Sequence, residues 1–477
     1  MEKISGRIAE CKILHEALQS KESELIAVYG RRRVGKTFLV REVYRKEIVF
    51  EFTGVHNAPM KMQLSAFFSA IRKQFGSRVK GDVPLNWFAA FELLKECLET
   101  QPKSVKKVLF FDEFPWIHTR KSLFLESFEH FWNTWLSRRR DVVVVICGSS
   151  ASWMLQKVVH NKGGLHNRLT RRIRLMPFTL SETEQYLRSR KIDIDRYQIL
   201  QLYMAFGGIP QYLKLISKGE SVAQTIDREC FTRDGFLRDE FGGLYSSLFT
   251  DSTDHMKIIG ALASKPWGLT RNQLIESCKI ASGGTLSKLL SELEDSGFII
   301  SYIPFDKNSS DKIFKLQDEY SLFYLKFIRN SRLTGTGTWL RQLSSATWKS
   351  WAGFAFERVC LKHIAQIEAA LGISGVQTQY APWFSKGNKQ ASGAQIDLLI
   401  DRADHCINVC EMKYAEDEFR ISSGYASELK NKLKVFKRET GSRKTLFLCF
   451  ITTYGLMPNQ YTTSLVQSSY TTDILFQ

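Results

Sequence analysis

A stretch near the N-terminus has the residue types and spacing that phosphate binding requires. The residues that fit the pattern G-x-x-x-x-G-K-[ST], with the two before them, are Val28-Tyr29-Gly30-Arg31-Arg32-Arg33-Val34-Gly35-Lys36-Thr37. In such a loop, backbone N–H groups and the N-terminus of the following helix bind anionic phosphates. An apolar run at 24–29 predicts a buried strand before the loop, and a helical pattern at 38–44 follows it. This context favours a phosphate-binding P-loop over a glycine turn beside a buried strand.

Two side chains of this loop have defined chemistry in a nucleotide site. We expect Lys36 to reach the β- and γ-phosphates and the Thr37 hydroxyl to ligate Mg²⁺. The residues expected to contact the cofactor are Gly30, Arg31, Arg32, Arg33, Val34, Gly35, Lys36, Thr37 and Phe38. The pattern therefore predicts ATP with Mg²⁺ as the cofactors.

Two further strand ends carry polar residues that such a site needs. An apolar strand at 107–111 leads into Asp112 and Glu113. We expect Asp112 to hold the Mg²⁺ shell and Glu113 to polarise the attacking water. A third strand, at 141–147, is followed by Ser149, which either senses the γ-phosphate or caps the next helix.

A second set of residues, near the C-terminus, has the chemistry of phosphodiester cleavage. A predicted strand at 395–400 places Asp397 near its start, and the next strand carries Glu411 and Lys413 on one face. Two carboxylates and a lysine can hold Mg²⁺, or Mn²⁺, and position a water against a phosphodiester. Glu357, on an upstream helix, could supply another carboxylate to the metal shell. The spacing also occurs by chance on amphipathic hairpins, but the order helix, strand, strand, helix favours catalysis.

A basic helix is predicted downstream of the second of these strands, which spans 408–413. Such a helix could run beside a phosphate backbone, because Lys and Arg supply most phosphate contacts. Its basic residues are Lys430, Lys432, Lys434, Lys437 and Arg438.

The elements that must position these residues fall into segments with recognisable domain boundaries. Residues 1–180 alternate strand-like and helix-like segments, as a parallel α/β core does. Residues 181–250 predict a helical lid, and residues 251–330 predict the three helices and hairpin of a winged helix-turn-helix. A polar linker at 331–338 precedes a last domain at 339–477. The expected fold class is therefore a multidomain α/β protein.

The winged segment is a weak candidate for direct DNA reading. Its predicted recognition helix at 285–296 carries Lys288 as the single basic residue, beside Glu292, Glu294 and Asp295. Phosphate contacts need Lys or Arg, so this helix is poorly equipped for them. A structural coupler between the two ends of the chain is the favoured alternative.

The composition excludes several classes of protein. At 477 residues the chain should hold about three domains, and 44% hydrophobic with 24% charged residues is ordinary for a globular protein. No apolar run approaches the ~18 residues of a membrane span, and the start lacks the apolar core of a signal peptide. The nine cysteines include no C-x-x-C pair, and no histidine pattern completes a zinc site around Cys406 and Cys410. We therefore expect a cytoplasmic protein with no membrane partner.

The charge balance points to an acidic polymer as partner. The formal net charge is +18, and most of the excess lies in residues 1–253. The densest clusters there are Arg138, Arg139, Arg140, Arg168, Arg171, Arg172 and Arg174. Such runs are often solvated faces, but some of these residues could serve a nucleotide or nucleic acid, most plausibly DNA.

These motifs carry a resemblance to known proteins. Residues 1–330 resemble the archaeal-type ATPase family, a P-loop group within the AAA+/STAND assemblage, in which a winged helix commonly follows the ATPase. The residues that carry the resemblance are 30–37, Asp112-Glu113, Gly148-Ser149-Ser150 and Gly207-Gly208-Ile209-Pro210. Residues 339–477 resemble the restriction-endonuclease-like PD-(D/E)xK fold that many of these ATPases carry.

The resemblance implies roles and also exposes departures. It implies a nuclease core of Asp397, Glu411 and Lys413, with Glu357 as the helix carboxylate. No proline precedes Asp397, and Gln395 stands where relatives often carry Glu. The lid segment offers no sensor arginine, so an arginine finger would come from Arg168, Arg171 or Arg172. Because relatives act across subunit interfaces, the resemblance also implies a homo-oligomer.

Two hypotheses from different classes follow. The first is an ATP-hydrolysing enzyme whose nucleotide state controls a metal-dependent DNA nuclease domain, as would suit defence against foreign DNA or a mobile element. The second is a nucleotide-dependent regulatory switch whose nuclease-fold domain binds nucleic acid or protein without cutting. The intact trio of Asp397, Glu411 and Lys413 favours the first, since a retired site has no chemical need for it.

Overall fold

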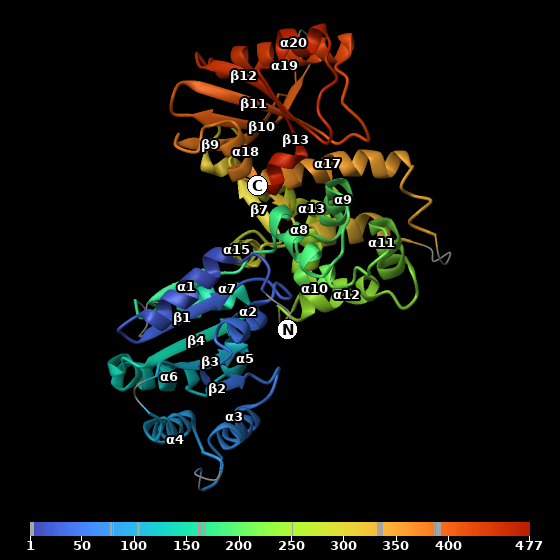
Figure 1. Cartoon of the computed structure of the whole chain (residues 1–477). Helices are drawn as coiled ribbons and strands as arrows, with labels where there is room; N and C mark the ends of the chain where they lie inside the picture. The colour runs from blue at the N-terminus through green and yellow to red at the C-terminus, as the bar shows by residue number, and fades with distance from the viewer. Residues whose placement is uncertain are drawn as a thin grey trace. The chain divides into compact units, whose positions relative to one another are not determined.

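The chain divides into two compact units (Figure 1). This computed structural model describes residues 4–76, 79, 81–102, 105–160, 165, 167–249, 251–331, 337–385, 387 and 393–477. Unit 1 comprises Met1–Pro177, Ser246–Thr250 and Leu290–Gly297, and unit 2 comprises Phe178–Tyr245, Asp251–Leu289 and Phe298–Gln477. Residues 332–336 of the predicted linker lie outside the described residues.

Unit 1 is built on a five-stranded parallel sheet of order β2-β3-β4-β1-β5. The strands are β1 (Glu24–Tyr29), β2 (Ile48–Thr53), β3 (Lys107–Asp112), β4 (Val142–Gly148) and β5 (Arg171–Arg174). β1, β3 and β4 are buried along their whole length, as continuous apolar runs in a parallel sheet are. The expected parallel α/β core is therefore confirmed, with the three predicted strands within a residue of their positions.

Helices connect these strands and cover the sheet. They are α1 (Ile8–Gln19), α2 (Lys36–Val43), α3 (Met60–Phe75), α4 (Trp87–Glu99), α5 (Phe114–Ile117), α6 (Phe124–Thr134) and α7 (Ala151–Met154). The helical pattern expected at 38–44 is α2, which begins two residues earlier, at Lys36, and so includes the last two residues of the phosphate-binding pattern. Parallel neighbours need such crossover connections, because a short hairpin cannot join them.

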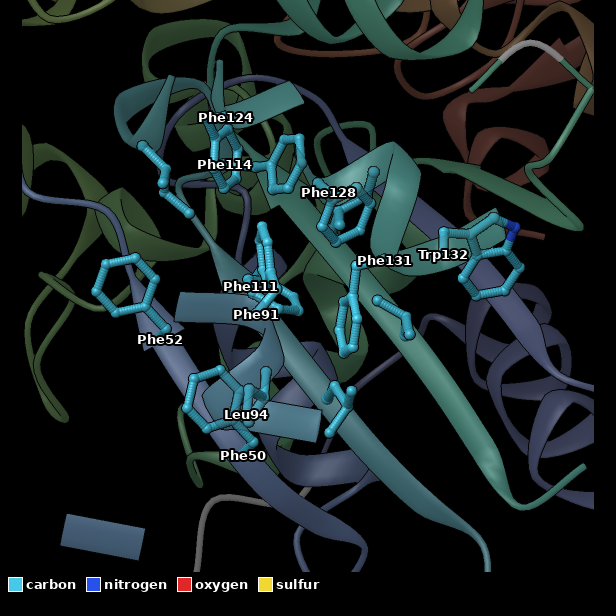
Figure 2. Packing of buried hydrophobic residues seen from close by; sticks show 14 of the residues in the cluster. Phe50, Phe52, Phe91, Leu94, Phe111, Phe114, Phe124, Phe128, Phe131 and Trp132 are labelled. Carbon is cyan, nitrogen blue, oxygen red and sulfur yellow. The ribbon is translucent and has the colours of Figure 1, made fainter. Parts of the chain in front are cut away.

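One face of the unit 1 sheet packs against an aromatic core (Figure 2). Phe91 of α4 lies within it: its ring stacks on Phe131 of α6 with centroids 5.1 Å apart and meets Phe128 edge-on at 5.9 Å. The same ring meets Phe111 of β3 at 6.4 Å. Aromatic pairs of this kind add roughly 0.5–1.5 kcal/mol beyond burial. Helix α4 is thereby fixed to the strand that ends at Asp112.

Unit 2 begins with a group of helices where the lid was expected. They are α8 (Leu180–Ser189), α9 (Arg196–Phe206), α10 (Pro210–Leu213), α11 (Val222–Phe231) and α12 (Phe236–Ser246). The break between α9 and α10 is enforced at Gly208, where an added Cβ would lie 1.9 Å from the Phe178 carbonyl oxygen. The segment is helical, as predicted, and its function as a lid stays a prediction.

The next part of the chain has three helices and a small antiparallel sheet. The helices are α13 (Thr253–Ala263), α14 (Arg271–Cys278) and α15 (Gly284–Asp295), of which the last part groups with unit 1. The strands β6 (Leu269–Thr270), β7 (Ile299–Tyr302) and β8 (Ile313–Leu316) form a sheet of order β6-β8-β7. The predicted helices and hairpin are present, and their identification as a winged helix-turn-helix stays a prediction. Two short elements follow, α16 (Glu319–Phe323) and η5 (Tyr324–Ile328).

The C-terminal part of unit 2 is a mixed sheet of order β13-β12-β11-β10-β9. Its strands are β9 (Thr378–Ser385), β10 (Ala394–Arg402), β11 (Cys406–Lys413), β12 (Thr445–Thr452) and β13 (Ser468–Thr471). β9, β10 and β11 pair antiparallel, and β11, β12 and β13 pair parallel. Its helices are α17 (Ala346–Lys362), α18 (Ile364–Ala370), α19 (Ser423–Thr440), which crosses from β11 to β12, and α20 (Gln460–Leu465). None of the helices in the described residues is long and apolar enough to cross a membrane.

A buried histidine joins two parts of unit 2. The Nδ1 atom of His363, just after α17, lies 2.7 Å from the Val359 carbonyl oxygen, which can only accept. Nδ1 therefore carries the proton, and Nε2 accepts a hydrogen bond from the Leu180 backbone N–H at 3.0 Å. This N–H at the start of α8 is among those without a partner inside the helix. Burial lowers the pKa of His363 to about 4, so the ring is neutral at neutral pH.

We expect His363 to make unit 2 sensitive to mild acid. The unfolded chain takes up this proton near pH 6.5 and the folded chain only near pH 4, so stability is full above pH 6.5 and falls as pH falls toward 4. The contribution at stake is about 3 kcal/mol. Melting curves of wild type and His363→Gln should therefore differ most at neutral pH and converge toward pH 4. The exposed His15→Gln serves as control, and a constant difference across the range would contradict the assignment.

We expect Phe91→Ala to destabilise unit 1 by about 3–5 kcal/mol, because it removes a buried ring from the centre of the aromatic core. Urea unfolding of the full chain measures the loss. Phe88→Ala is a matched control on the same helix, since its side chain is 42% exposed. Equal losses in the two variants would show that the aromatic core does not stabilise this unit as described.

Candidate functional site

The predicted phosphate-binding loop, residues 30–35, follows β1 at the carboxyl end of the unit 1 sheet. Asp112 ends β3, and Ser149 directly follows β4. Because β4 lies between β3 and β1, the three strand ends are neighbours at one edge of the sheet. Ligands of open α/β sheets bind at this edge. The structure therefore brings together the three segments that the sequence selected.

The loop backbone takes conformations that its glycines make possible. Gly30 has a φ of 147°, and a Cβ at this position would lie 2.3 Å from the Leu175 carbonyl oxygen. Gly35 has a φ of 92° and stands directly before α2. Among the described residues, no side chain caps the N-terminus of α2, so its first N–H groups can bind an anion. This cradle fits a phosphate group.

Lys36 is folded back onto the loop that precedes it. Its ammonium donates to the Gly30 carbonyl oxygen at 2.9 Å and to the Arg31 carbonyl oxygen at 2.8 Å. The side chain is buried, and burial lowers the pKa of Lys36, while Asp112 and Glu113 act in the opposite direction. A phosphate that offers stronger acceptors could draw this ammonium away from the two carbonyls.

Thr37 and Asp112 are already in contact. The Thr37 hydroxyl donates to Oδ2 of Asp112 at 2.9 Å, and the Glu113 N–H donates to Oδ1 at 3.0 Å. Burial and the neighbouring Glu113 raise the pKa of Asp112. A hydroxyl and a carboxylate side by side beneath a phosphate cradle are oxygen ligands of the kind that Mg²⁺ prefers. The donor set therefore fits a Mg²⁺–nucleotide complex.

Glu113 is held by the end of β4. Its Oε2 accepts hydrogen bonds from the Ser149 hydroxyl at 2.7 Å and from the Ser149 N–H at 3.1 Å. The backbone of Glu113 lies in the left-handed region, with a φ of 44°, a conformation that non-glycine residues adopt mostly at functional sites. The N-cap of α7 is Ser150, which makes no side-chain cap hydrogen bond. Ser149 therefore contacts Glu113 and does not cap the next helix.

The arginines selected from the sequence occupy different surroundings. Arg31 is buried in the loop, whereas Arg168 is exposed before β5. Arg171 lies 3.1 Å from Glu16 and 3.4 Å from Glu24, so it serves an ion-pair cluster within unit 1. The loop is also held by a residue whose role sequence reasoning missed. Arg7 donates to the Met176 carbonyl oxygen at 2.7 Å and to that of Val34 at 3.4 Å.

The second candidate site lies on neighbouring strands in unit 2. The pairing of Leu398 with Cys410 makes Asp397 and Glu411 the next opposed positions of β10 and β11. Opposed residues of an antiparallel pair have Cβ atoms about 5 Å apart. The two carboxylates selected from the sequence therefore face each other, and burial together with the charge of Glu411 raises the pKa of Asp397.

Glu411 is fully buried and has three polar neighbours. Its Oε1 accepts from the Lys432 ammonium at 2.6 Å, and its Oε2 accepts from the Tyr425 hydroxyl at 2.6 Å. The Lys413 ammonium lies 3.4 Å from Oε2. Burial alone would raise the pKa of Glu411, but Lys432 and Lys413 outweigh it, so the pKa is lowered and the group is ionised.

Asp397 and Glu357 are less strongly paired. Oδ1 of Asp397 accepts from the Gln395 amide at 2.9 Å, while burial and Glu411 raise the pKa of Asp397. Burial and Asp397 raise the pKa of Glu357 to about 7. Lys315 of β8 is also buried and acts electrostatically on both carboxylates. Gln395 is thus a hydrogen-bond donor to Asp397 where a Glu would add a second negative charge.

The carboxylates do not form a ready-made metal cage. Among the described residues, no group of three or more His, Cys, Asp or Glu side chains could hold a metal ion. The donor set is a facing pair, Asp397 and Glu411, and Glu357 is not brought into a cluster with them. Mg²⁺ is often held by one or two carboxylates together with water and substrate phosphates, and a facing pair fits this mode.

Sequence reasoning missed three contributors to this site. Lys432 was expected on the exposed basic face of α19, but its ammonium turns inward to Glu411. Tyr425 carried no motif signal, and Lys315 comes from a different part of the chain. For Lys432 a signal existed: it lies three residues after the buried Leu429 and four before the buried Phe436, on the same side of the helix.

We expect Lys36→Ala to weaken ATP binding by about 100-fold, because it removes the ammonium that lies in the phosphate cradle. Titration of a fluorescent ATP analogue into the full chain measures the affinity. Arg41→Ala is the matched control: it removes a cation from the same helix that is 2.6 Å from Glu51 and half exposed. Equal affinity of Lys36→Ala and wild type would show that the loop is not a nucleotide site.

Comparison with known proteins agrees with the geometry of unit 1. Residues 5–216 match a family model described as an ATPase domain predominantly from Archaea. An uncharacterized protein of Methanocaldococcus jannaschii, MJECL04, is 24% identical over 403 residues, which cover 82% of this chain and 83% of that protein. This similarity is longer than the ATPase domain.

Solved structures are similar at low sequence identity. The Walker-type ATPase PABY2304 of Pyrococcus abyssi is 17% identical, with a TM-score of 0.47, and the match covers 68% of this chain and 96% of that one. The ORC2 protein of Aeropyrum pernix is 14% identical, with a TM-score of 0.42, and covers 72% and 96%. The expected ATPase resemblance is confirmed over the part matched by the family model. The chain therefore carries an archaeal-type ATPase domain at residues 5–216.

Proposed function

We propose that this protein hydrolyses ATP at the carboxyl edge of the unit 1 sheet. The loop at 30–35 and the N-terminus of α2 would hold the phosphates, with Lys36 on the β- and γ-phosphates. Thr37 and Asp112 would hold Mg²⁺, which neutralises phosphate charge when bound. The contact between Thr37 and Asp112 is the observation that carries this proposal, because it places a hydroxyl and a carboxylate together at the phosphate cradle.

Glu113 would act as the general base in this reaction. It would accept a proton from the water whose oxygen bonds to the γ-phosphorus, while the bond to the β-phosphate oxygen breaks. Its Oε2 accepts hydrogen bonds from Ser149. We infer that Ser149 orients this carboxylate, so Ser149 is a positioning residue.

We further propose that the C-terminal part of unit 2 is a metal-dependent nuclease controlled by the nucleotide state of unit 1. Asp397 and Glu411 would hold Mg²⁺ or Mn²⁺, which polarises a phosphodiester when bound. Lys413, beside Glu411, would orient the attacking water. As the water oxygen bonds to phosphorus and gives up its proton to solvent, the ester P–O bond breaks and the leaving oxygen takes up a proton. The facing carboxylates on β10 and β11, with Lys413 at 3.4 Å from Glu411, support this proposal.

A specific observation favours a second candidate. Both oxygens of Glu411 already accept hydrogen bonds from Lys432 and Tyr425, which leaves this carboxylate fewer lone pairs for a metal ion. A site whose carboxylate is neutralised from within also suits a nucleotide-dependent switch that binds without cutting. In this alternative, unit 2 binds nucleic acid or protein according to the nucleotide state of unit 1.

Where the partner is a nucleic acid, DNA is the proposed polymer. The net charge of +18 favours an acidic partner. Lys430, Lys434, Lys437 and Arg438 of α19 are exposed, and Lys432 of the same helix reaches Glu411. This basic face would place a phosphate backbone near the facing carboxylates. A homo-oligomer would let an arginine such as Arg168 act on a neighbouring subunit's nucleotide. Defence against foreign DNA or a mobile element would suit such a pairing of activities.

We expect Asp397→Asn to reduce Mg²⁺- or Mn²⁺-dependent DNA cleavage at least about 100-fold, because it removes a metal-binding charge. Plasmid and linear DNA are incubated with the full chain, and products are separated on gels. Asp401→Asn is the control, since Asp401 lies on the same strand and pairs with Lys444. Cleavage that survives in Asp397→Asn would contradict the proposed site. Absence of cleavage in wild type, with ATP hydrolysis intact, would favour the switch.

A further inference from the structure

A cavity of about 570 Å³ lies among three elements of unit 2, within the size range of ligand sites. It is lined by α13, by α16 with η5, and by α17. Its cationic lining residues are Lys326, Arg329 and Arg358. Of the described residues that line it, none is Asp or Glu. The cavity therefore carries an excess of positive charge.

Arg358 forms the buried end of this charge. Its side chain is on α17 and only 6% exposed, yet Nε and Nη1 have no hydrogen-bond partner among the described residues. Burial lowers the pKa of Arg358 to about 10, which still leaves it charged at neutral pH. The nearby Glu319 is ion-paired with Lys362 at 2.5 Å. A buried guanidinium with unused donors calls for an acceptor from outside the protein.

The mouth of the cavity carries matching polar groups. Lys326 and Arg329 are exposed, and both line the cavity. Thr347 and Ser350 are exposed three residues apart on α17 and bring hydroxyl donors to the same cavity. Two outer cations and one inner guanidinium suit a ligand with several anionic oxygens, since the guanidinium fork matches two oxygens of a phosphate.

An aromatic wall completes the cavity. Trp351 lines it and stacks on Trp348 with ring centroids 5.3 Å apart. Phe354 also lines it and is held edge-on by Trp267 at 5.5 Å. Nucleobases pack on such aromatic rings, whereas the side chains of an acidic peptide would leave this wall without a partner. The combination of cations, hydroxyls and rings is that of a nucleotide site.

We propose that this cavity binds the phosphate of a nucleotide, free or within single-stranded nucleic acid, with Arg358 on the phosphate and the base against Trp351 and Phe354. The site is separate from the phosphate-binding loop of unit 1, and the proposal does not depend on cleavage at Asp397. It gives unit 2 a direct means of recognising nucleic acid or a signalling nucleotide.

Binding measurements on the full chain test this site. Lys36→Ala is the background in every protein, so that the loop of unit 1 does not contribute. The probes are a short fluorescein-labelled single-stranded DNA, a panel of mononucleotides and poly-glutamate. Two variants alter the cavity at exposed positions: the double variant Lys326→Ala/Arg329→Ala, and Ser350→Trp, which fills its mouth. Lys349→Ala, an exposed cation on α17 outside the cavity lining, is the matched control.

We expect both cavity variants to weaken binding of the DNA or of a mononucleotide about tenfold or more, and the control to leave it unchanged. ATP hydrolysis, measured without the Lys36→Ala background, should stay at the wild-type rate in these variants and so report intact folding. Binding of mononucleotides identifies a free nucleotide as ligand, and binding of the DNA alone identifies a strand. Binding that is equal in all variants, or specific to poly-glutamate, would overturn the proposal.

Discussion

A charged side chain that leaves water needs a partner, and both candidate sites depend on this constraint. Lys36 is buried, and its ammonium donates to carbonyl oxygens of its own loop. Glu411 is fully buried, and both its oxygens accept hydrogen bonds from Lys432 and Tyr425. In each site the protein supplies a partner from its own chain. A phosphate or a metal ion would therefore meet a charged side chain that the protein has already partnered.

In both sites, the partners of the charged side chains come from neighbouring elements of the fold. At the ATP site, the partners of Thr37, Asp112 and Glu113 are set by contacts among three neighbouring strand ends. The aromatic core packs α4 and α6 tightly against the strands. Because such packing makes the sheet rigid, a contact that changes at one strand end would affect the neighbouring strand ends. At the second site, Lys432 belongs to α19, so the charge balance around Glu411 depends on the position of this helix.

Much of the fold could be predicted because its signals are local. Continuous apolar runs gave β1, β3 and β4, and the glycine spacing placed the loop before α2. The facing of Asp397 and Glu411 needed only the assumption that two consecutive strands pair. Leu398 pairs with Cys410, which places Asp397 and Glu411 opposite each other one residue further along. This register is set by the sheet, and residue spacing alone does not predict it.

The remaining contacts depend on tertiary packing. Lys432 looked like one of several exposed cations, and only the packing of α19 against the sheet turns it toward Glu411. Ser149 had two possible roles, and the choice between them rested on where the Glu113 side chain points. Arg7 reaches Met176, which is far away in the chain. Arg358 has two donor nitrogens without a partner among the described residues, and no sequence pattern records this.

The proposed function requires that the nucleotide state of unit 1 controls the site on β10 and β11. The most direct test uses Glu113→Gln, which should bind ATP but hydrolyse it slowly, and compares its rate of Mg²⁺-dependent DNA cleavage with and without ATP. We predict that ATP changes the rate about tenfold or more in this variant, as binding-driven coupling of typical size would. Cleavage at the same rate with and without ATP would show that the nucleotide state of unit 1 does not control this site.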